Sequence, residues 1–155
     1  MKLDYVQALK RVHEARGAWI MHGQEPLLEQ NLLDAFRKSW QQQEVERQRY
    51  DISNVGDWKN VFNALNSLSL FSNQLAIEVH GNIKPDANTL KLLKSYLQHN
   101  EHNLLLIVLP KQDSSSLKSA FFQLVEANGV VVPLTATYPQ DRQRILTFEA
   151  DQLGI

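Results

Sequence analysis

Cysteine is absent from this chain of 155 residues. Without it the protein can form neither disulfide bonds nor thiolate metal sites, and its composition fits a reducing compartment. Long apolar runs are absent as well. The longest one, Leu104 to Leu109, is far too short to span a membrane, and the amino terminus lacks the apolar core of a signal peptide. We therefore expect a cytoplasmic protein with no membrane contact.

A surplus of either charge is also missing. The 16 Lys and Arg residues nearly balance the 17 Asp and Glu residues, so the formal net charge is -1 and provides no general attraction to nucleic acid. Four lysines could contact phosphate locally, but no aromatic residues alternate with them, and a solvated surface explains them. These are Lys91, Lys94, Lys111 and Lys118. Any contact with DNA is expected to be weak or indirect.

Short apolar or β-favouring segments alternate with segments of helical period along the chain. The expected strands are 18–22, 47–52, 75–79, 103–109 and 130–134. The expected helices are 3–16, 27–42, 85–97, 113–127, 141–153 and one that opens at Trp58, after Asp57 as its N-cap, and ends near Leu70. This alternation predicts an α/β fold, a five-stranded parallel sheet with helices on both faces. The segment 103–109 should be central and 47–52 near an edge.

In a sheet of this kind, ligands bind beyond the carboxyl ends of the strands. The turn after the first expected strand begins Gly23-Gln-Glu-Pro26. A nucleotide-binding turn would instead carry a glycine-rich loop ending in Gly-Lys-Ser or Gly-Lys-Thr, because backbone amides and the lysine hold the phosphates. Glu25 adds a negative charge and Pro26 removes an N–H group. We therefore expect no ATP binding through this loop, and no cofactor.

Histidines supply an alternative hypothesis. His22 and His80 both close expected strands on the carboxyl side, with Glu25 and Glu78 near them in sequence. A stand-alone doubly wound α/β domain with a small-molecule or metal site at the strand carboxyl ends is therefore conceivable. Neither pair has a recognised ligand spacing, and polar residues often close strands at the solvent edge. His99 and His102, in a loop, are interpreted as solvated.

Two large apolar residues, Leu70 and Phe71, stand at a polar helix end between serines and asparagine. One interpretation places them under the sheet, because apolar residues at the ends of elements are usually part of the core. The other is that they project as a knob into a groove on another protein. Spacing alone favours the first interpretation and leaves the second open.

Several segments, taken in order and with their separations, resemble the amino-terminal domain of the delta subunit of the bacterial DNA polymerase III clamp loader. They are Gly17-Ala-Trp-Ile-Met-His-Gly-Gln-Glu-Pro-Leu-Leu28, Asp57-Trp58 followed by Phe62, Ser67-Leu-Ser-Leu-Phe71, and the run Leu104 to Leu109. The combination of the Gly-x-Glu-Pro-Leu-Leu turn with Ser-Leu-Phe ahead of the third strand is the most specific part. The resemblance extends over most of the chain, from Gly17 to Ile155.

The resemblance implies a degenerate AAA+ (RecA-like) domain without a working nucleotide site, in agreement with Glu25 and Pro26. Delta subunits bind the ring-shaped sliding clamp, the beta subunit, and open it for loading on primed DNA. In that family a Leu-Phe pair enters an apolar pocket on the clamp, so Leu70 and Phe71 are the implied anchors and Leu68 the preceding contact. The delta prime and gamma/tau subunits are implied partners of the full-length protein. The resemblance implies no catalytic residues and no metal, although the holoenzyme is a DNA polymerase, a transferase.

The chain departs from the family in its length. Delta subunits continue into a small second domain and a helical collar that assembles the loader. Here we expect residues 1–135 to form the degenerate AAA+ type clamp-binding domain, and 136–155 to form a connector and the first helix of a truncated lid domain. An excised fragment is favoured over a naturally short relative. Such a fragment should bind the clamp without joining the loader pentamer.

Overall fold

A computed structural model describes residues 1–67, 74–99 and 102–135 of the chain. Within these residues, five parallel strands form one sheet in the order β2-β3-β4-β1-β5. The strands are β1 (Gly17–Gly23), β2 (Glu46–Ile52), β3 (Leu75–Gly81), β4 (Leu104–Leu109) and β5 (Val130–Leu134). The helices are α1 (Tyr5–Leu9), the 3₁₀ turn η1 (Val12–Glu14), α2 (Pro26–Gln42), α3 (Asp57–Ser67), α4 (Ala87–His99), α5 (Ser114–Leu117) and α6 (Ala120–Asn128).

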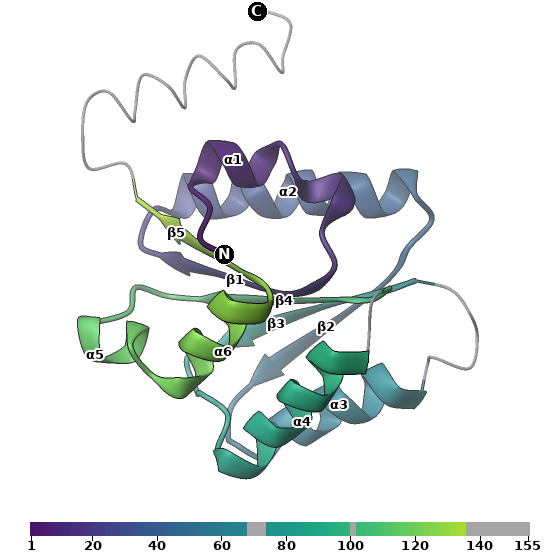
Figure 1. Cartoon of the computed structure of the whole chain (residues 1–155). Coiled ribbons are helices and arrows are strands. Elements are labelled where there is room, and N and C mark those ends of the chain that lie inside the picture. Colours follow the sequence, from purple (N-terminus) through teal and green to yellow (C-terminus); the bar gives the residue numbers. More distant parts are fainter. Residues whose placement is uncertain (68–73, 100–101, 136–155) are drawn as a thin grey trace, which may run out of the picture.

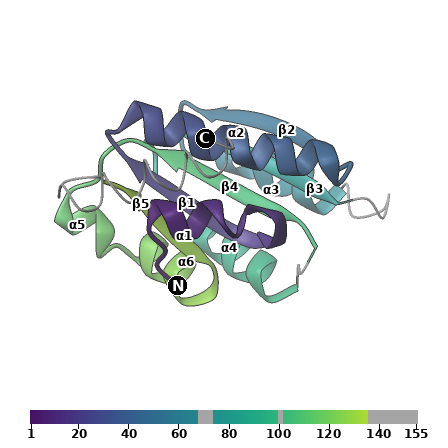
Figure 2. The same ribbon diagram turned by 90° about the horizontal axis from the view of Figure 1, so that it is seen from above.

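The helices cover both faces of the sheet, which confirms the predicted α/β fold. Figure 1 shows α1 and α2 on one face and α3, α4 and α6 on the other, and Figure 2 shows α1 and α2 lying over the strands. Strand β4 is the middle strand and all its residues are buried, as its continuous apolar sequence predicts. Strand β2 is at an edge, also as predicted, and its side chains are largely polar and partly exposed.

The sheet separates two hydrophobic clusters of described residues. On the α2 face, Trp19 of β1 meets Phe36 of α2 edge-to-face, with ring centroids 5.5 Å apart. On the other face, Trp58 of α3 is buried against Phe62 and against Phe121 of α6. Side chains of a strand alternate between faces, so neighbouring residues of β1 contribute to different clusters. No helix in the described part of the chain combines the length and the apolar character that crossing a membrane requires.

The amino-terminal helix is shorter than the expected 3–16. The Asp4 carboxylate accepts a hydrogen bond from the Gln7 backbone N–H at 2.8 Å, and the Gln7 side chain accepts one from the Asp4 N–H at 3.0 Å. This capping box begins α1 at Tyr5. The residues before it extend along β5, where the Leu3 N–H donates to the Val131 carbonyl at 3.0 Å. The spacing of apolar residues there reflects burial against β5 as well as a helical face.

The expected helix 113–127 is divided into α5 and α6. Asp113 is the N-cap of α5 and accepts a hydrogen bond from the Ser116 N–H at 2.7 Å, but Ser119 is extended (φ -65°, ψ 159°) and interrupts the helix. Gly129 does not adopt the left-handed conformation expected of a helix stop, because its φ is -146°. Glycine is needed there for space instead: a Cβ atom would lie 2.1 Å from the Ala18 carbonyl oxygen of β1.

Asp57 is the first residue of α3 and not its N-cap, which corrects the prediction. Its carboxylate accepts hydrogen bonds from the backbone N–H groups of Ser53 at 2.7 Å and Asn54 at 3.1 Å. Asp57 therefore closes the turn that leads out of β2. For α4, Asp86 accepts from the Thr89 N–H at 2.8 Å and fixes the start of the helix close to the expected position.

Candidate functional site

The turn at the carboxyl end of β1 is too short to hold a polyphosphate. Strand β1 ends at Gly23 and α2 begins at Pro26, so only Gln24 and Glu25 connect them. A phosphate-binding loop needs several successive backbone N–H groups around the phosphates. Here Glu25 precedes the helix and Pro26, the first helical residue, has no N–H group to offer. The next residue, Leu27, is 69% exposed, and its apolar side chain offers no positive charge to a phosphate.

Gly23 holds this turn against the neighbouring strand. A Cβ atom at Gly23 would lie 2.5 Å from the Leu134 carbonyl oxygen of β5, so the two backbones approach more closely than another residue would allow. Farther along the same edge, the Gln112 side chain donates to Asn82 at 3.1 Å and to the Pro110 carbonyl at 2.8 Å. Sequence reasoning missed the Asn82–Gln112 pair, since the two residues are far apart in the chain. The residues of this turn therefore do not fit a nucleotide.

The sheet keeps the two strand-end histidines apart. The His22 ring packs edge-to-face on Phe122 of α6, with centroids 5.5 Å apart, and burial, assisted by the charge of Lys2, lowers the pKa of His22. His80 is on the opposite face, where its Nε2 atom lies 3.1 Å from Glu78 Oε2. Strand β4 also stands between β1 and β3.

The hypothesis of a two-histidine metal or acid–base site is therefore contradicted by the structure. Within the described residues, no group of three or more His, Cys, Asp or Glu side chains could hold a metal ion. His99 and His102 are both exposed, which confirms that their side chains are solvated, but His99 is the last residue of α4 and not part of a loop; its Nδ1 atom lies 2.9 Å from the Ser95 carbonyl oxygen. The four lysines named above are exposed too, which confirms that their side chains are solvated.

Glu78 is the centre of a buried ionic cluster that the sequence did not reveal. Its side chain has no exposed surface. Arg37 of α2 donates to both carboxylate oxygens, at 2.9 Å from Nε and 3.0 Å from Nη2, and Arg47 of β2 approaches Oε1 at 3.1 Å. Burial would raise the pKa of Glu78, but hydrogen bonds with His80 and Arg37 and the charges of Arg37 and Arg47 outweigh it and lower the pKa to about 2. The cluster connects α2, β2 and β3.

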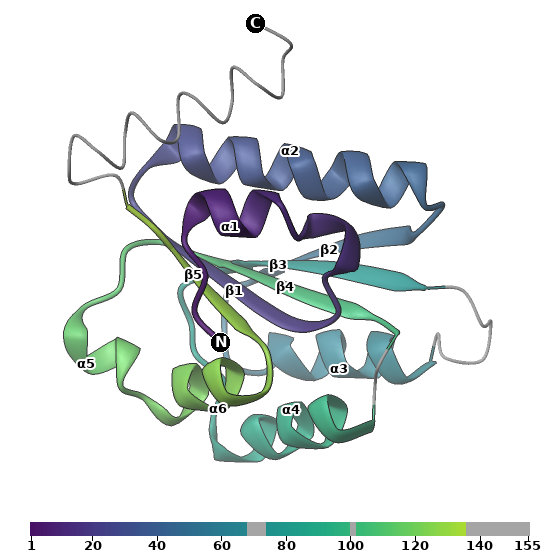
Figure 3. The same ribbon diagram turned by 45° about the horizontal axis from the view of Figure 1, so that its top comes forward.

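The segment that the resemblance implies for clamp binding connects α3 to β3 at the amino ends of the strands, which we call the amino edge of the sheet. The expected contact residues Leu68, Leu70 and Phe71 lie outside the described residues. Both of their neighbouring elements are described: α3 ends at Ser67 and β3 begins at Leu75. Figure 3 shows these two ends at the side of the sheet opposite the turn between β1 and α2.

Each side of this segment is held by buried groups. The apolar face of α3 is buried through Val61, Phe62 and Leu65. On the β3 side, the Gln74 carbonyl accepts from the Glu46 N–H at 3.1 Å, and the Leu75 N–H donates to Asn103 Oδ1 at 2.9 Å.

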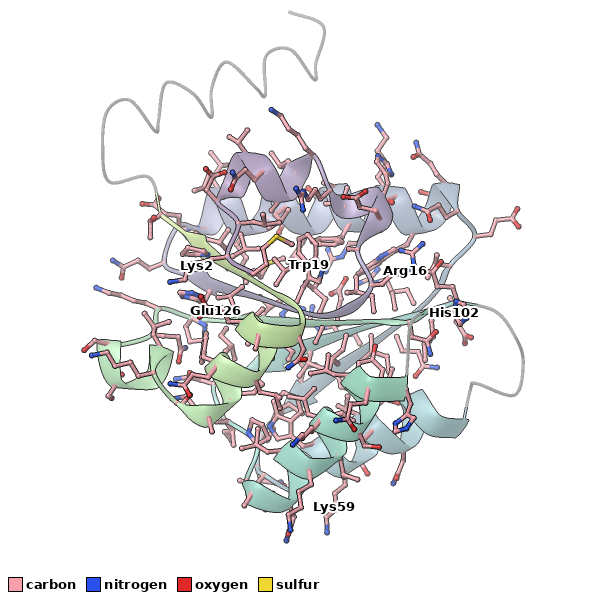
Figure 4. The ribbon with its side chains drawn as sticks, in the orientation of Figure 1. Lys2, Arg16, Trp19, Lys59, His102 and Glu126 are labelled. Atoms are coloured by element: carbon pink, nitrogen blue, oxygen red, sulfur yellow. The ribbon has the colours of Figure 1, made fainter. Side chains whose placement is uncertain are left out.

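The same edge carries a further buried hydrogen-bonding group. The Tyr96 hydroxyl lies 2.9 Å from the Gly17 carbonyl oxygen and 3.1 Å from that of Asn103, and burial raises the pKa of Tyr96. Tyr96 therefore ties α4 to the starts of β1 and β4. Arg16 and His102 flank this edge, whereas Lys2 and Glu126, a weak surface ion pair at 4.0 Å, lie at the far side (Figure 4).

Comparison with known structures agrees with the AAA+ type of fold. The chain is similar to the ORC2 protein of Aeropyrum pernix in its ADPNP–ADP complexes, with a TM-score of 0.55 and 12% identity over 94% of this chain and 50% of that chain. It is also similar to Trip13 from Rhizobiales, with a TM-score of 0.58 and 9% identity over 92% of this chain and 54% of that one. A third neighbour is the HORMA:CdnC:Trip13 complex of E. coli MS115-1, with a TM-score of 0.55 and 10% identity over 92% of this chain and 52% of that chain.

These identities are low, so the likeness concerns the fold alone. The chain spans about half the length of the structures that it matches. A search of curated proteins gives no significant match. The family model described as "DNA polymerase III, delta subunit" matches residues 19–135, from β1 through β5. Since that match extends over most of the sequence, the chain belongs to the DNA polymerase III delta subunit family.

Proposed function

We propose that this chain is the clamp-binding part of a clamp-loader delta subunit, which binds the sliding clamp and helps to open it for loading on primed DNA. The observation that carries the proposal is the family match over residues 19–135, which includes the segment 68–73 and both elements beside it. In this proposal Leu70 and Phe71 enter an apolar pocket on the clamp, and Leu68 adds a contact before them.

The surroundings of the segment support this role. Burying one Leu or Phe side chain contributes about 1.5–3 kcal/mol, so two or three anchors supply a useful share of a binding free energy. Part of that gain is offset by the entropy that the interface side chains lose on binding. Because α3 is held by its buried face and β3 by hydrogen bonds to Gln74 and Leu75, both ends of the segment start from fixed positions.

We also propose that the chain does not hydrolyse ATP itself. The turn at the carboxyl ends of the strands supports this part of the proposal. This turn, at Glu25 and Pro26, does not fit a nucleotide, so the free energy for opening the ring comes from binding the clamp and from the other loader subunits. We further propose that residues 1–135 are the clamp-binding domain and that 136–155 lead into a lid domain. Delta prime and gamma/tau are then partners of the full-length protein, and contact with DNA is weak or indirect.

The experiment is a titration of a fluorescently labelled sliding clamp with the 155-residue chain. Leu70→Ala combined with Phe71→Ala should abolish binding and leave the circular dichroism spectrum and the melting temperature unchanged. Leu27→Ala is the matched control, since Leu27 is equally apolar and 69% exposed but lies at the opposite edge of the sheet. A double variant that loses its secondary structure would instead support the interpretation in which both residues are buried.

Opening is tested separately from binding. A clamp assembled on closed circular DNA can leave only if one of its interfaces opens, so gel filtration of labelled clamp with the DNA follows ring opening directly. The chain should accelerate release, and the double variant should not. If the chain binds the clamp without accelerating release, opening depends on parts of the protein beyond these residues and the proposal is reduced to binding.

A further inference from the structure

Asn103 is placed between two strands so that its side chain, and not the backbone, receives the first N–H group of β3. The Leu75 N–H donates to Asn103 Oδ1 at 2.9 Å, and Asn103 is only 6% exposed. The regular pairing of β3 with β4 begins one residue later, where Ala76 is opposite Leu104. The bond to Asn103 therefore extends the hold of β4 on β3 by one residue, toward the segment 68–73.

The other neighbour of β3 holds the same point. The Glu46 N–H of β2 donates to the Gln74 carbonyl at 3.1 Å. The residues that follow the segment are thus fixed from β2 and from β4 at once. Of these two hydrogen bonds, only the one to Asn103 involves a side chain, so only this bond can be removed by a substitution.

From this geometry we infer that Asn103 is a positioning residue for clamp binding: it fixes the base from which the segment carrying Leu70 and Phe71 leaves the sheet. The inference rests on the proposed function and adds to it a residue that does not itself contact the clamp. Without this bond the start of β3 is less restrained, so more conformational entropy is lost when the clamp binds and the affinity is lower.

The test compares Asn103→Leu, which removes the acceptor and keeps a side chain branched at Cγ, with Asn103→Asp, which retains an oxygen at the same distance along the side chain. Tyr96→Phe is the matched control, because it removes the hydroxyl that bonds to the Asn103 backbone carbonyl but leaves the Asn103 side chain and its bond to the Leu75 N–H in place. For each variant of the 155-residue chain, three quantities are measured: the melting temperature, hydrogen exchange at the Leu75 amide, and affinity for the sliding clamp.

Asn103→Leu should speed exchange at Leu75 and weaken clamp binding about two- to tenfold, the range that corresponds to one ordinary hydrogen bond. Asn103→Asp should restore both, and Tyr96→Phe should lower the melting temperature while leaving the affinity near that of the original chain. If Asn103→Leu does not fold, Asn103→Ser, whose oxygen is one bond closer to the backbone, takes its place.

Unchanged affinity in Asn103→Leu with faster exchange at Leu75 would overturn the inference. Equal losses of affinity in Asn103→Leu and Tyr96→Phe would also overturn it, because general destabilisation would then explain both. Neither result affects the proposed function, which fails on a different observation, the absence of clamp binding by the unaltered chain.

Discussion

Replacing Glu78 by Gln tests whether the buried ionic cluster stabilises the fold. The folded-state pKa of Glu78 is about 2, against an ordinary value of 4.5. Since one pKa unit corresponds to about 1.4 kcal/mol, the ionised carboxylate contributes about 3 kcal/mol to the free energy of unfolding at neutral pH. Removing one partner of a buried ion pair costs a similar amount, about 3–5 kcal/mol, because the remaining charges lose their partner. Glu78→Gln should therefore destabilise the chain by about 3 kcal/mol at pH 7.

The pH dependence has a definite sign. The pKa of Glu78 is depressed on folding, so its contribution is fully present above the unfolded value of 4.5 and is lost as the pH falls through that value toward about 2. The original chain should lose stability over this interval. The Gln variant has no carboxylate to protonate at this position and should lose less, so the two chains converge in stability at low pH.

The assay is urea unfolding followed by circular dichroism at pH 7, 5 and 3. Asp51→Asn is the control, since Asp51 and Arg49 form an exposed ion pair at 3.2 Å that should contribute less than about 1 kcal/mol. A loss of under about 1 kcal/mol in Glu78→Gln, or a gap from the original chain that stays constant from pH 7 to pH 3, would refute the reasoning about the cluster.

The remaining predictions concern one close backbone contact and the turn between β1 and α2. Gly129→Ala should lower the free energy of unfolding by more than about 2 kcal/mol in a urea titration, because its Cβ atom would lie 2.1 Å from the Ala18 carbonyl oxygen; an effect of a few tenths would show that the strand ends separate easily. Leu27→Lys supplies a lysine at the start of α2, but the turn before it has only two residues, so neither this variant nor the original chain should bind a fluorescent ATP analogue at submillimolar concentration. Binding by the variant alone would mean that the turn can rearrange around phosphates.

The sequence predicted the framework of the fold because that framework depends on local patterns. Apolar runs located four of the five strands, and the most apolar of them, Leu104–Leu109, is the central one; β2 was located by β-favouring residues in a polar segment. Pro26 and the spacing of leucines after it located α2. The division of 113–127 was not predictable in this way, since neither proline nor glycine marks Ser119 as a break.

Contacts between distant residues account for the other differences. Glycine is required at 129 because the Ala18 carbonyl oxygen lies so close. The buried charge of Glu78 is balanced by arginines on α2 and β2. In each case the partners are far apart in sequence. The proposed metal site failed for the same reason, because a shared strand end does not specify a shared face: His22 and His80 point to opposite sides of the sheet. The contact residues Leu68, Leu70 and Phe71 stay a prediction.

The central claim is that Leu70 and Phe71 together bind the sliding clamp, and the affinity of the double alanine variant tests it most directly. Two buried anchors of about 1.5–3 kcal/mol each correspond to a loss of affinity of at least about a hundredfold. The account predicts that loss in a variant whose melting temperature matches that of the original chain. Affinity within a few-fold of the original, or a loss shared equally by Leu27→Ala at the opposite edge, would contradict it.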